Sequence, residues 1–184
     1  MTGDMSDAGV GALALDAETL YAELRRAVQG LLARGPQPCY LVGVASGGAW
    51  LAARLQRELG LPGEAGVIAP TLHRDDYAQR GLAATSAHTR LPFTVDGAHV
   101  LLIDDVLYTG RTLRAVLNEL FDYGRPASVR LAVLVDRDGR ELPVAADAAA
   151  VRLPLPPEQS FELEQRPDGR FGFVLLNRPA PSRR

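Results

Sequence analysis

The stretch VLLIDDVLYTGRT, residues 100–112, joins an apolar run to two neighbouring carboxylates and then to a hydroxyl-rich glycine turn. The run HVLLI at 99–103 predicts a buried strand, and RTLRAVLNELFDYG at 111–124 has the apolar period of a helix. In open α/β sheets, ligands bind beyond the carboxyl ends of the strands. We therefore expect Asp104 and Asp105 to lie at the mouth of a cleft.

The turn after the carboxylates is suited to an anion. The backbone N–H groups of residues 109–112 would converge at a helix N-terminus, where the helix dipole also favours negative charge. Such a turn fits a phosphate monoester, and the carboxylates can accept hydrogen bonds from the 2′ and 3′ hydroxyls of a ribose. The spacing therefore predicts a site for one ribose 5-phosphate group.

Strand and helix patterns alternate on both sides of this stretch. CYLVGV at 39–44 and VRLAVLV at 129–135 are continuous apolar runs, which is typical of strands buried on both faces. A helix is predicted from Asp16, as its N-cap, to the Gly35-Pro36 pair. The other predicted elements are a helix at 48–60, with Gly60 after its last turn, and a short strand at 66–69. The pattern predicts an α/β fold with a doubly wound, mainly parallel sheet.

The remaining segments predict a flap, a hood and two mobile ends. The polar segment at about 71–92 has no convincing period and is expected to form a flexible flap. FELEQ and FGFVLLN, joined through RPDGR, predict a β-hairpin within a C-terminal hood. Residues 1–15 and 179–184 are expected to be mobile, which leaves residues 16–178 as a single domain.

The composition excludes several classes of protein. All 20 basic residues are arginine, so sites that need a lysine, such as a Walker A loop, are excluded. The net charge of -2 argues against indiscriminate binding to nucleic acid. No apolar stretch approaches the roughly 20 residues that cross a bilayer, and no secretion signal is evident, so we expect a cytoplasmic protein without membrane contact. The lone Cys39 lies in an apolar run and is expected to be a small buried side chain.

VLLIDDVLYTGRT resembles the phosphoribosyl-pyrophosphate signature of type I phosphoribosyltransferases. The run from this motif through NELFDYGRPASV to LAVLVDRDGRELP is similar to the PyrR family of bifunctional pyrimidine operon regulators and uracil phosphoribosyltransferases. The likeness covers roughly residues 18–145. It implies that uracil and phosphoribosyl pyrophosphate (PRPP) give UMP and pyrophosphate, with Mg²⁺ held mainly through the substrate and no protein ligand assigned to it.

The resemblance also implies roles for particular residues. Asp104 and Asp105 are the catalytic carboxylates on the ribose hydroxyls. The 5′-phosphate group is assigned to Val106, Leu107, Tyr108, Thr109, Gly110, Arg111 and Thr112. Pyrophosphate is assigned to Ser46, Gly47 and Gly48 of the ASGG turn and to Arg74 and Arg90 of the flap. The base is assigned to Val135, Asp136 and Arg137.

Several alternatives stay open at this point. The chain could be mainly a UMP-sensing attenuator that binds pyrimidine-leader RNA, although the acidic balance and the absence of lysine disfavour an RNA surface. The fold could also serve another base, such as a purine or orotate. LLIDDV is superficially similar to the acidic pair of phosphoacceptor receiver domains, but those also use a lysine, and GVASGG does not match the GxGxxG of dinucleotide sites. Related proteins are commonly dimers or larger, which implies a homo-oligomer.

Overall fold

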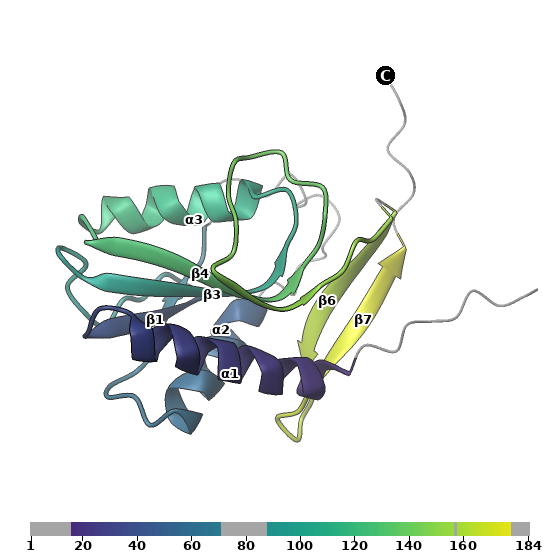
Figure 1. Cartoon of the computed structure of the whole chain (residues 1–184), viewed down its shortest axis with the longest axis horizontal. Coiled ribbons are helices and arrows are strands. Elements are labelled where there is room, and N and C mark those ends of the chain that lie inside the picture. Colours follow the sequence, from purple (N-terminus) through teal and green to yellow (C-terminus); the bar gives the residue numbers. More distant parts are fainter. Residues whose placement is uncertain (1–15, 71–87, 157, 178–184) are drawn as a thin grey trace, which may run out of the picture.

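The computed structural model describes residues 16–70, 88–156 and 158–177, and its centre is a five-stranded sheet. The strand order is β2-β1-β3-β4-β5, and every neighbouring pair is parallel (Figure 1). The strands are β1 (Cys39–Val44), β2 (Gly66–Ile68), β3 (His99–Leu107), β4 (Ser128–Asp136) and β5 (Ala148–Arg152). Outside this sheet, β6 (Gln159–Gln165) and β7 (Phe171–Asn177) pair antiparallel as a hairpin.

Helices cover both faces of the sheet, as Figure 1 shows. The helices α1 (Ala17–Arg34) and α2 (Gly47–Glu58) lie on one face, and α3 (Arg111–Asp122) lies on the other. Because successive residues of a strand point to opposite faces, β3 contributes to both cores. Leu101 and Ile103 pack with α1 and α2, whereas Leu102 packs with α3. The predicted doubly wound α/β fold is confirmed.

Local signals in the sequence set several element boundaries. The side chain of Asp16 accepts a hydrogen bond from the N–H of Thr19 at 3.1 Å, so the predicted N-cap of α1 is confirmed. After α2, Gly60 has a φ of 61°, a left-handed conformation that glycine adopts without a steric penalty. The predicted strand at 39–44 coincides with β1, and the predicted hairpin is formed by β6 and β7.

Two predictions about strands were wrong. The strand predicted to end at residue 103 runs on to Leu107, because Val106 and Leu107 pair with Val135 and Asp136 of β4. The edge strand β5 was missed, since its sequence AAAVR is rich in alanine and carries little of the β-branched and aromatic composition of strands. β5 becomes a strand through its parallel pairing with β4.

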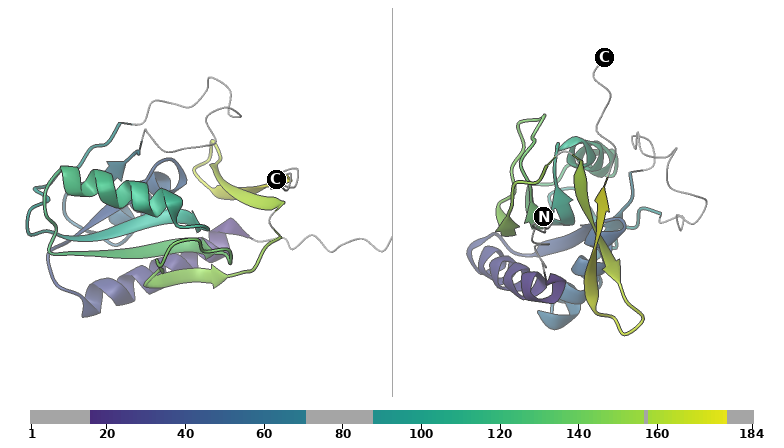
Figure 2. Two further views of the ribbon diagram at one scale, coloured as in Figure 1. Left: turned by 90° about the horizontal axis from the view of Figure 1, so that it is seen from above. Right: turned by 90° about the vertical axis from the view of Figure 1, so that its right-hand side faces the viewer.

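The hairpin formed by β6 and β7, residues 159–177, is here called the hood. Figure 2 shows that the hood stands beyond one end of the five-stranded layer. This is the end at which α1 begins, and because the chain leaves the last turn of α1 to enter β1, it is also the end at which the parallel strands finish (Figure 1). The hood therefore stands beside the edge of the sheet where α/β proteins bind their ligands.

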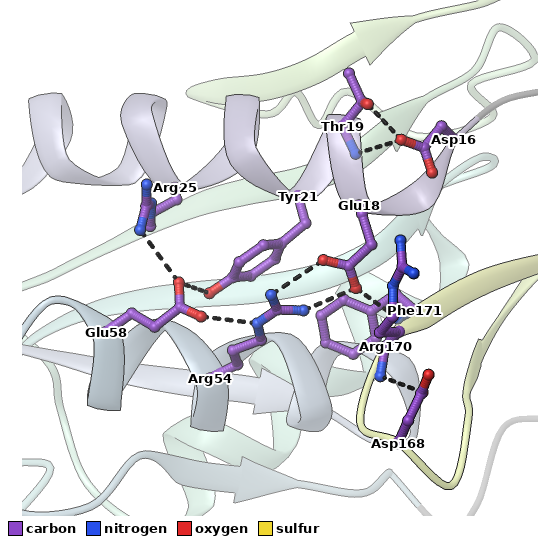
Figure 3. Close-up of polar contacts among 10 residues, drawn as sticks. All are labelled: Asp16, Glu18, Thr19, Tyr21, Arg25, Arg54, Glu58, Asp168, Arg170 and Phe171. Atoms are coloured by element: carbon purple, nitrogen blue, oxygen red, sulfur yellow. Dashed lines mark hydrogen bonds and ion pairs between the residues drawn. The ribbon is translucent and has the colours of Figure 1, made fainter.

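A polar cluster ties the hood to α1 and α2, as Figure 3 shows. The carboxylate of Glu18 in α1 accepts the backbone N–H of Phe171 at 2.7 Å and two N–H groups of Arg54 at 2.8 and 3.0 Å. Arg54 also donates to Glu58 at 2.8 Å, and its guanidinium lies 4.2 Å from the ring centroid of Tyr21. One carboxylate thus joins residues that are 153 positions apart in the chain.

We expect this cluster to make stability depend on pH. The hydrogen bonds from Arg54 hold the pKa of Glu18 below its usual value of 4.5. Its contribution to the free energy of unfolding is therefore fully present above about pH 4.5 and is lost as the pH falls through the lower, folded-state pKa. Glu18→Gln should cost about 1 to 3 kcal/mol at neutral pH, measured by urea unfolding, and should flatten the loss of stability in acid. Glu23→Gln, at an exposed pair with Arg26, is the control, and an equal loss in both variants would contradict the prediction.

The composition led to expectations about membrane contact and about Cys39. Among the residues that the structure describes, no helix is both long and apolar enough to cross a membrane. Cys39 is half-buried at the start of β1, and burial raises the pKa of its thiol above the usual range. This protonated thiol lies at the opposite end of β1 from the ASGG turn, so it is remote from the predicted site.

Candidate active site

The turn after β1 and the loop after β3 meet at one edge of the sheet, because β1 and β3 are parallel neighbours. Gly47, the first residue of α2, lies so close to β3 that a Cβ atom placed on it would be 2.5 Å from Oδ2 of Asp105. A Cβ atom on Gly48 would overlap the carbonyl oxygen of Ile103. The structure thus brings the predicted pyrophosphate turn and one of the predicted catalytic carboxylates into contact.

The two carboxylates leave β3 on opposite faces. The strand continues through both of them, so its alternation directs Asp105 toward α2 and Asp104, paired with Val133, toward the side of α3. Asp104 is 9% exposed, and its Oδ1 accepts the N–H of Asp105 at 2.9 Å. Asp105 is half-buried, and its Oδ1 accepts the N–H of Val106 at 2.8 Å. The N-terminus of α2, which carries the positive end of the helix dipole, lies beside Asp105.

The loop between β3 and α3 comprises only residues 108–110. Gly110, the N-cap of α3, has a φ of 90°, and a Cβ atom on it would lie 2.6 Å from Cγ2 of Val144, so glycine is required here. The N–H of Arg111 donates to the hydroxyl of Thr109 at 3.2 Å. The N–H groups of Thr112 and Leu113 precede the first hydrogen bond of the helix, which Arg114 donates to Gly110 at 2.9 Å, and they lie at the positive end of the helix dipole. This is the expected form of an anion-binding loop.

Three of the residues assigned to the 5′-phosphate lie in β3 or in an ion pair. Val106 and Leu107 lie in β3 rather than in the phosphate loop, because both pair with β4. The side chain of Arg111 points to Glu141, with both Nε and Nη2 at 2.7 Å from Oε2. Val106 and Leu107 are thus strand residues, and Arg111 forms an exposed ion pair with Glu141.

The segment predicted to contact the base is built into the protein interior. Val135 is fully buried, and the carboxylate of Asp136 pairs with Arg140 and, at 3.5 Å, with Arg152. Arg137 is 2% exposed and donates to the carbonyl oxygens of Gln159 at 2.8 Å and Pro156 at 3.2 Å, where the chain enters the hood. Its guanidinium also stacks on the ring of Tyr108, 3.7 Å from the centroid. The sequence could not reveal the burial of Arg137, because its partners come from two other segments, the entrance to the hood and the loop after β3.

The predicted flap is only partly described. Arg74 lies outside the described residues, as does most of the segment at 71–92. Arg90, at its far end, exchanges two backbone hydrogen bonds of 2.8 Å with Val67, and its guanidinium lies 2.5 Å from a carboxylate oxygen of Glu64. Because Glu64 precedes β2, this pairing draws Arg90 toward the amino end of the strand rather than toward the predicted site.

Comparisons with known proteins agree with this geometry. A family model described as the phosphoribosyl transferase domain matches residues 14–162. A protein of Ralstonia nicotianae called bifunctional protein PyrR is 51% identical over 164 residues, which cover 87% of this chain and 94% of that protein. A protein of the same name from Pseudomonas aeruginosa is 46% identical over 133 residues, covering 72% of this chain and 78% of that one.

Solved structures of low sequence identity share the fold. A hypoxanthine-guanine phosphoribosyltransferase from Bacillus anthracis superposes with a TM-score of 0.61 at 16% identity, covering 78% of this chain and 85% of that one. The corresponding enzyme of Leishmania tarentolae gives a TM-score of 0.57 at 21% identity and covers 79% and 82% of the two chains. These similarities support the arrangement of the sheet, its helices and the loops at its carboxyl edge.

Proposed function

Because the chain belongs to the phosphoribosyl transferase family and, within it, to the PyrR proteins, we propose that it transfers ribose 5-phosphate from PRPP to uracil. The products are UMP and pyrophosphate. The observation that carries the proposal is the contact of Asp105 with the first turn of α2, at the sheet edge from which the α3 anion loop also rises. PRPP carries a ribose with a 5′-phosphate and a pyrophosphate group. In this proposal the ribose lies at Asp105, the pyrophosphate at the start of α2 and the 5′-phosphate at the start of α3.

The reaction replaces one bond at the anomeric carbon of the ribose. N1 of uracil forms a bond to this carbon, the bond to pyrophosphate breaks with its electron pair on the departing oxygen, and the N1 proton is released. Positive charge develops on the ribose while this happens, and Asp105 stabilises it from a position fixed by the N–H of Val106. Asp104 is proposed as the second carboxylate of the site, held by the N–H of Asp105.

The backbone supplies the contacts to both phosphate groups in this proposal. Residues 108–112 hold the 5′-phosphate with N–H groups at the start of α3, and residues 46–48 meet pyrophosphate at the start of α2. The chain has no lysine, so the cations available for pyrophosphate are arginine side chains, with Arg74 as the proposed one. Binding by peptide groups suits a substrate whose negative charge is spread over many oxygens.

The donor set at this edge fits Mg²⁺ bound mainly through substrate. Asp104 and Asp105 offer the carboxylate oxygens that this ion prefers, and the described residues contain no group of three or more His, Cys, Asp or Glu that could hold a metal ion alone. Bound there with the substrate, the ion supplies positive charge to the departing pyrophosphate.

A direct assay tests the proposed activity. The purified chain is incubated with PRPP, Mg²⁺ and each of uracil, hypoxanthine, guanine and orotate, and the release of pyrophosphate is followed. We expect uracil to give a kcat/KM at least about a hundredfold above that of the other bases, because a site built to hydrogen-bond one base leaves polar groups unpaired with another. A higher value for a purine or for orotate would assign a different base to the same fold.

Membership of the PyrR proteins supports a second role, in which the chain regulates pyrimidine genes by binding leader RNA in response to UMP. Gel-shift titrations against pyrimidine-leader RNA at two salt concentrations, with and without UMP, test the RNA partner. An RNA affinity that does not respond to UMP would contradict the regulatory role.

We further propose that residues 16–178 act as one domain in a cytoplasmic homo-oligomer.

A further inference from the structure

We propose that Arg140 is a positioning residue that orients the peptide groups of the 5′-phosphate loop by binding their carbonyl oxygens. The inference rests on the proposed function, since it assigns to the loop at 108–110 the binding of a phosphate group. Arg140 lies in the connection that follows β4, and the sequence analysis assigned it no role.

The carbonyl oxygens of three consecutive residues, Leu107 at the end of β3 and Tyr108 and Thr109 in the loop, are all bound by the segment at 137–141. That of Leu107 accepts the N–H of Arg137 at 3.0 Å and Nη1 of Arg140 at 3.2 Å. That of Tyr108 accepts the same Nη1 at 2.6 Å. That of Thr109 accepts the N–H of Glu141 at 3.0 Å. Three consecutive carbonyl groups thus face one supporting segment.

This arrangement determines where the N–H groups point. In a trans peptide the carbonyl and the N–H of the next residue point in opposite directions, and none of these peptide bonds is cis. With the carbonyl groups of residues 107–109 turned toward the segment at 137–141, the N–H groups of residues 108–110 are turned away from it. Because α3 begins at the next residue, these N–H groups and those of its first turn follow one another in one short stretch of chain, as in a backbone anion-binding nest.

Arg140 is itself held in place. Its Nη2 pairs with the carboxylate of Asp136, whose side chain is 12% exposed, and its Nη1 also donates to the carbonyl of Arg137 at 2.8 Å. A guanidinium is planar and rigid, so one group can serve a carboxylate and several carbonyl oxygens together. A lysine ammonium would keep the charge but would lack this fork. The substitution of Arg140 by lysine therefore separates orientation of the loop from simple attraction of the phosphate.

The surrounding residues support the same assignment. The ring of Tyr108 lies close to both Arg137 and Gly139, and a Cβ atom on Gly139 would overlap that ring. Gly139 also has a φ of 107°, which side chains other than glycine rarely adopt. The segment at 137–141 therefore packs closely against Tyr108 of the loop.

The test compares Arg140→Lys and Arg140→Gln with Arg130→Gln. Arg130 also donates a hydrogen bond to a backbone carbonyl, that of Leu31 at 3.2 Å, but it lies near the start of β4, at the opposite end of the sheet. Titration calorimetry with ribose 5-phosphate measures occupation of the loop without any catalysis. We expect both Arg140 variants to bind it at least about tenfold more weakly than the native chain, and Arg130→Gln to stay within about twofold.

Steady-state kinetics adds a readout that a general loss of structure would not produce. The Arg140 variants should raise KM for PRPP while KM for uracil changes less than about twofold. If they bind ribose 5-phosphate as tightly as the native chain, or if Arg130→Gln loses as much affinity, the inference is wrong. A native chain that binds ribose 5-phosphate but forms no nucleotide would instead refute the proposed function and leave the role of Arg140 intact.

A milder variant covers the case in which Arg140 variants do not fold. Asp136→Asn keeps the guanidinium but weakens its tether, so it should reduce ribose 5-phosphate affinity in the same direction and by a smaller factor. Native affinity in a folded Asp136→Asn chain would contradict the proposal.

Discussion

Replacement of Asp105 by asparagine is expected to lower kcat for UMP formation by at least about tenfold, with a smaller change in KM for PRPP. The substitution keeps the size of the side chain and an oxygen that can accept the N–H of Val106, but it removes the negative charge. The attraction between unit charges about 4 Å apart rises from about 1 kcal/mol in bulk water to about 4 kcal/mol at an effective dielectric constant of 20. The charge therefore matters most when positive charge develops on the ribose in a site from which water is excluded.

Asp122→Asn provides the control for this prediction. Asp122 is the last residue of α3, it is exposed, and it lies at the far end of the helix from the phosphate loop. Its substitution also changes the net charge by one unit and should leave kcat as in the native chain. A kcat for Asp105→Asn equal to that of the control would remove Asp105 from the mechanism.

Alanine should lower activity at two neighbouring glycines but should destabilise the protein at only one of them. In Gly47→Ala the new methyl group would meet the side chain of Asp105, 2.5 Å from Oδ2, and the carboxylate can move aside. Alanine is also a better helix former than glycine, so we expect the free energy of unfolding to stay within about 1 kcal/mol of the native value. Activity should nevertheless fall at least about tenfold, because the displaced carboxylate is no longer in its fixed position.

In Gly48→Ala the methyl group would meet backbone instead. It would overlap the carbonyl oxygen of Ile103 and lie 3.0 Å from Cα of Asp104, so α2 must move away from β3. We expect a loss of about 1 to 3 kcal/mol in the free energy of unfolding, together with the loss of activity. Urea unfolding and kinetics on both variants are the measurements. Equal stability losses at the two positions would show that the distinction between side chain and backbone is wrong.

The sequence predicted those parts of the fold that short-range chemistry determines. The Asp16 N-cap, Gly60 after α2 and the turn between β6 and β7 each depend on a few neighbouring residues. The end of β3 could not be predicted in this way, because Val106 and Leu107 are strand residues only through pairing with β4. The same holds for β5, whose alanine-rich sequence forms a strand because the edge of β4 is open to it.

The candidate site shows a similar division. The motif at 104–112 was enough to predict a strand, a glycine turn and the start of a helix in succession, since these are local, whereas the binding of an anion at that helix start stays a prediction. The opposite faces of Asp104 and Asp105 follow from the extension of β3, which was not predicted. The burial of Arg137 depends on carbonyl groups about 20 residues away at the entrance to the hood, and no local pattern indicates it. The role proposed for Arg140 likewise depends on contacts with Leu107 and Tyr108, more than 30 residues away, which no local pattern indicates.

The contact between Glu18 and the backbone of Phe171 also bears on how the chain matures during synthesis. A ribosome makes α1 before β7, so the carboxylate of Glu18 has no Phe171 to bind until residue 171 has been made. Until then Tyr21 lacks the ring of Phe171, which lies 5.4 Å from it in the finished protein. A nascent chain stalled before residue 171 should consequently be far more open to proteases at its first helix than the released product.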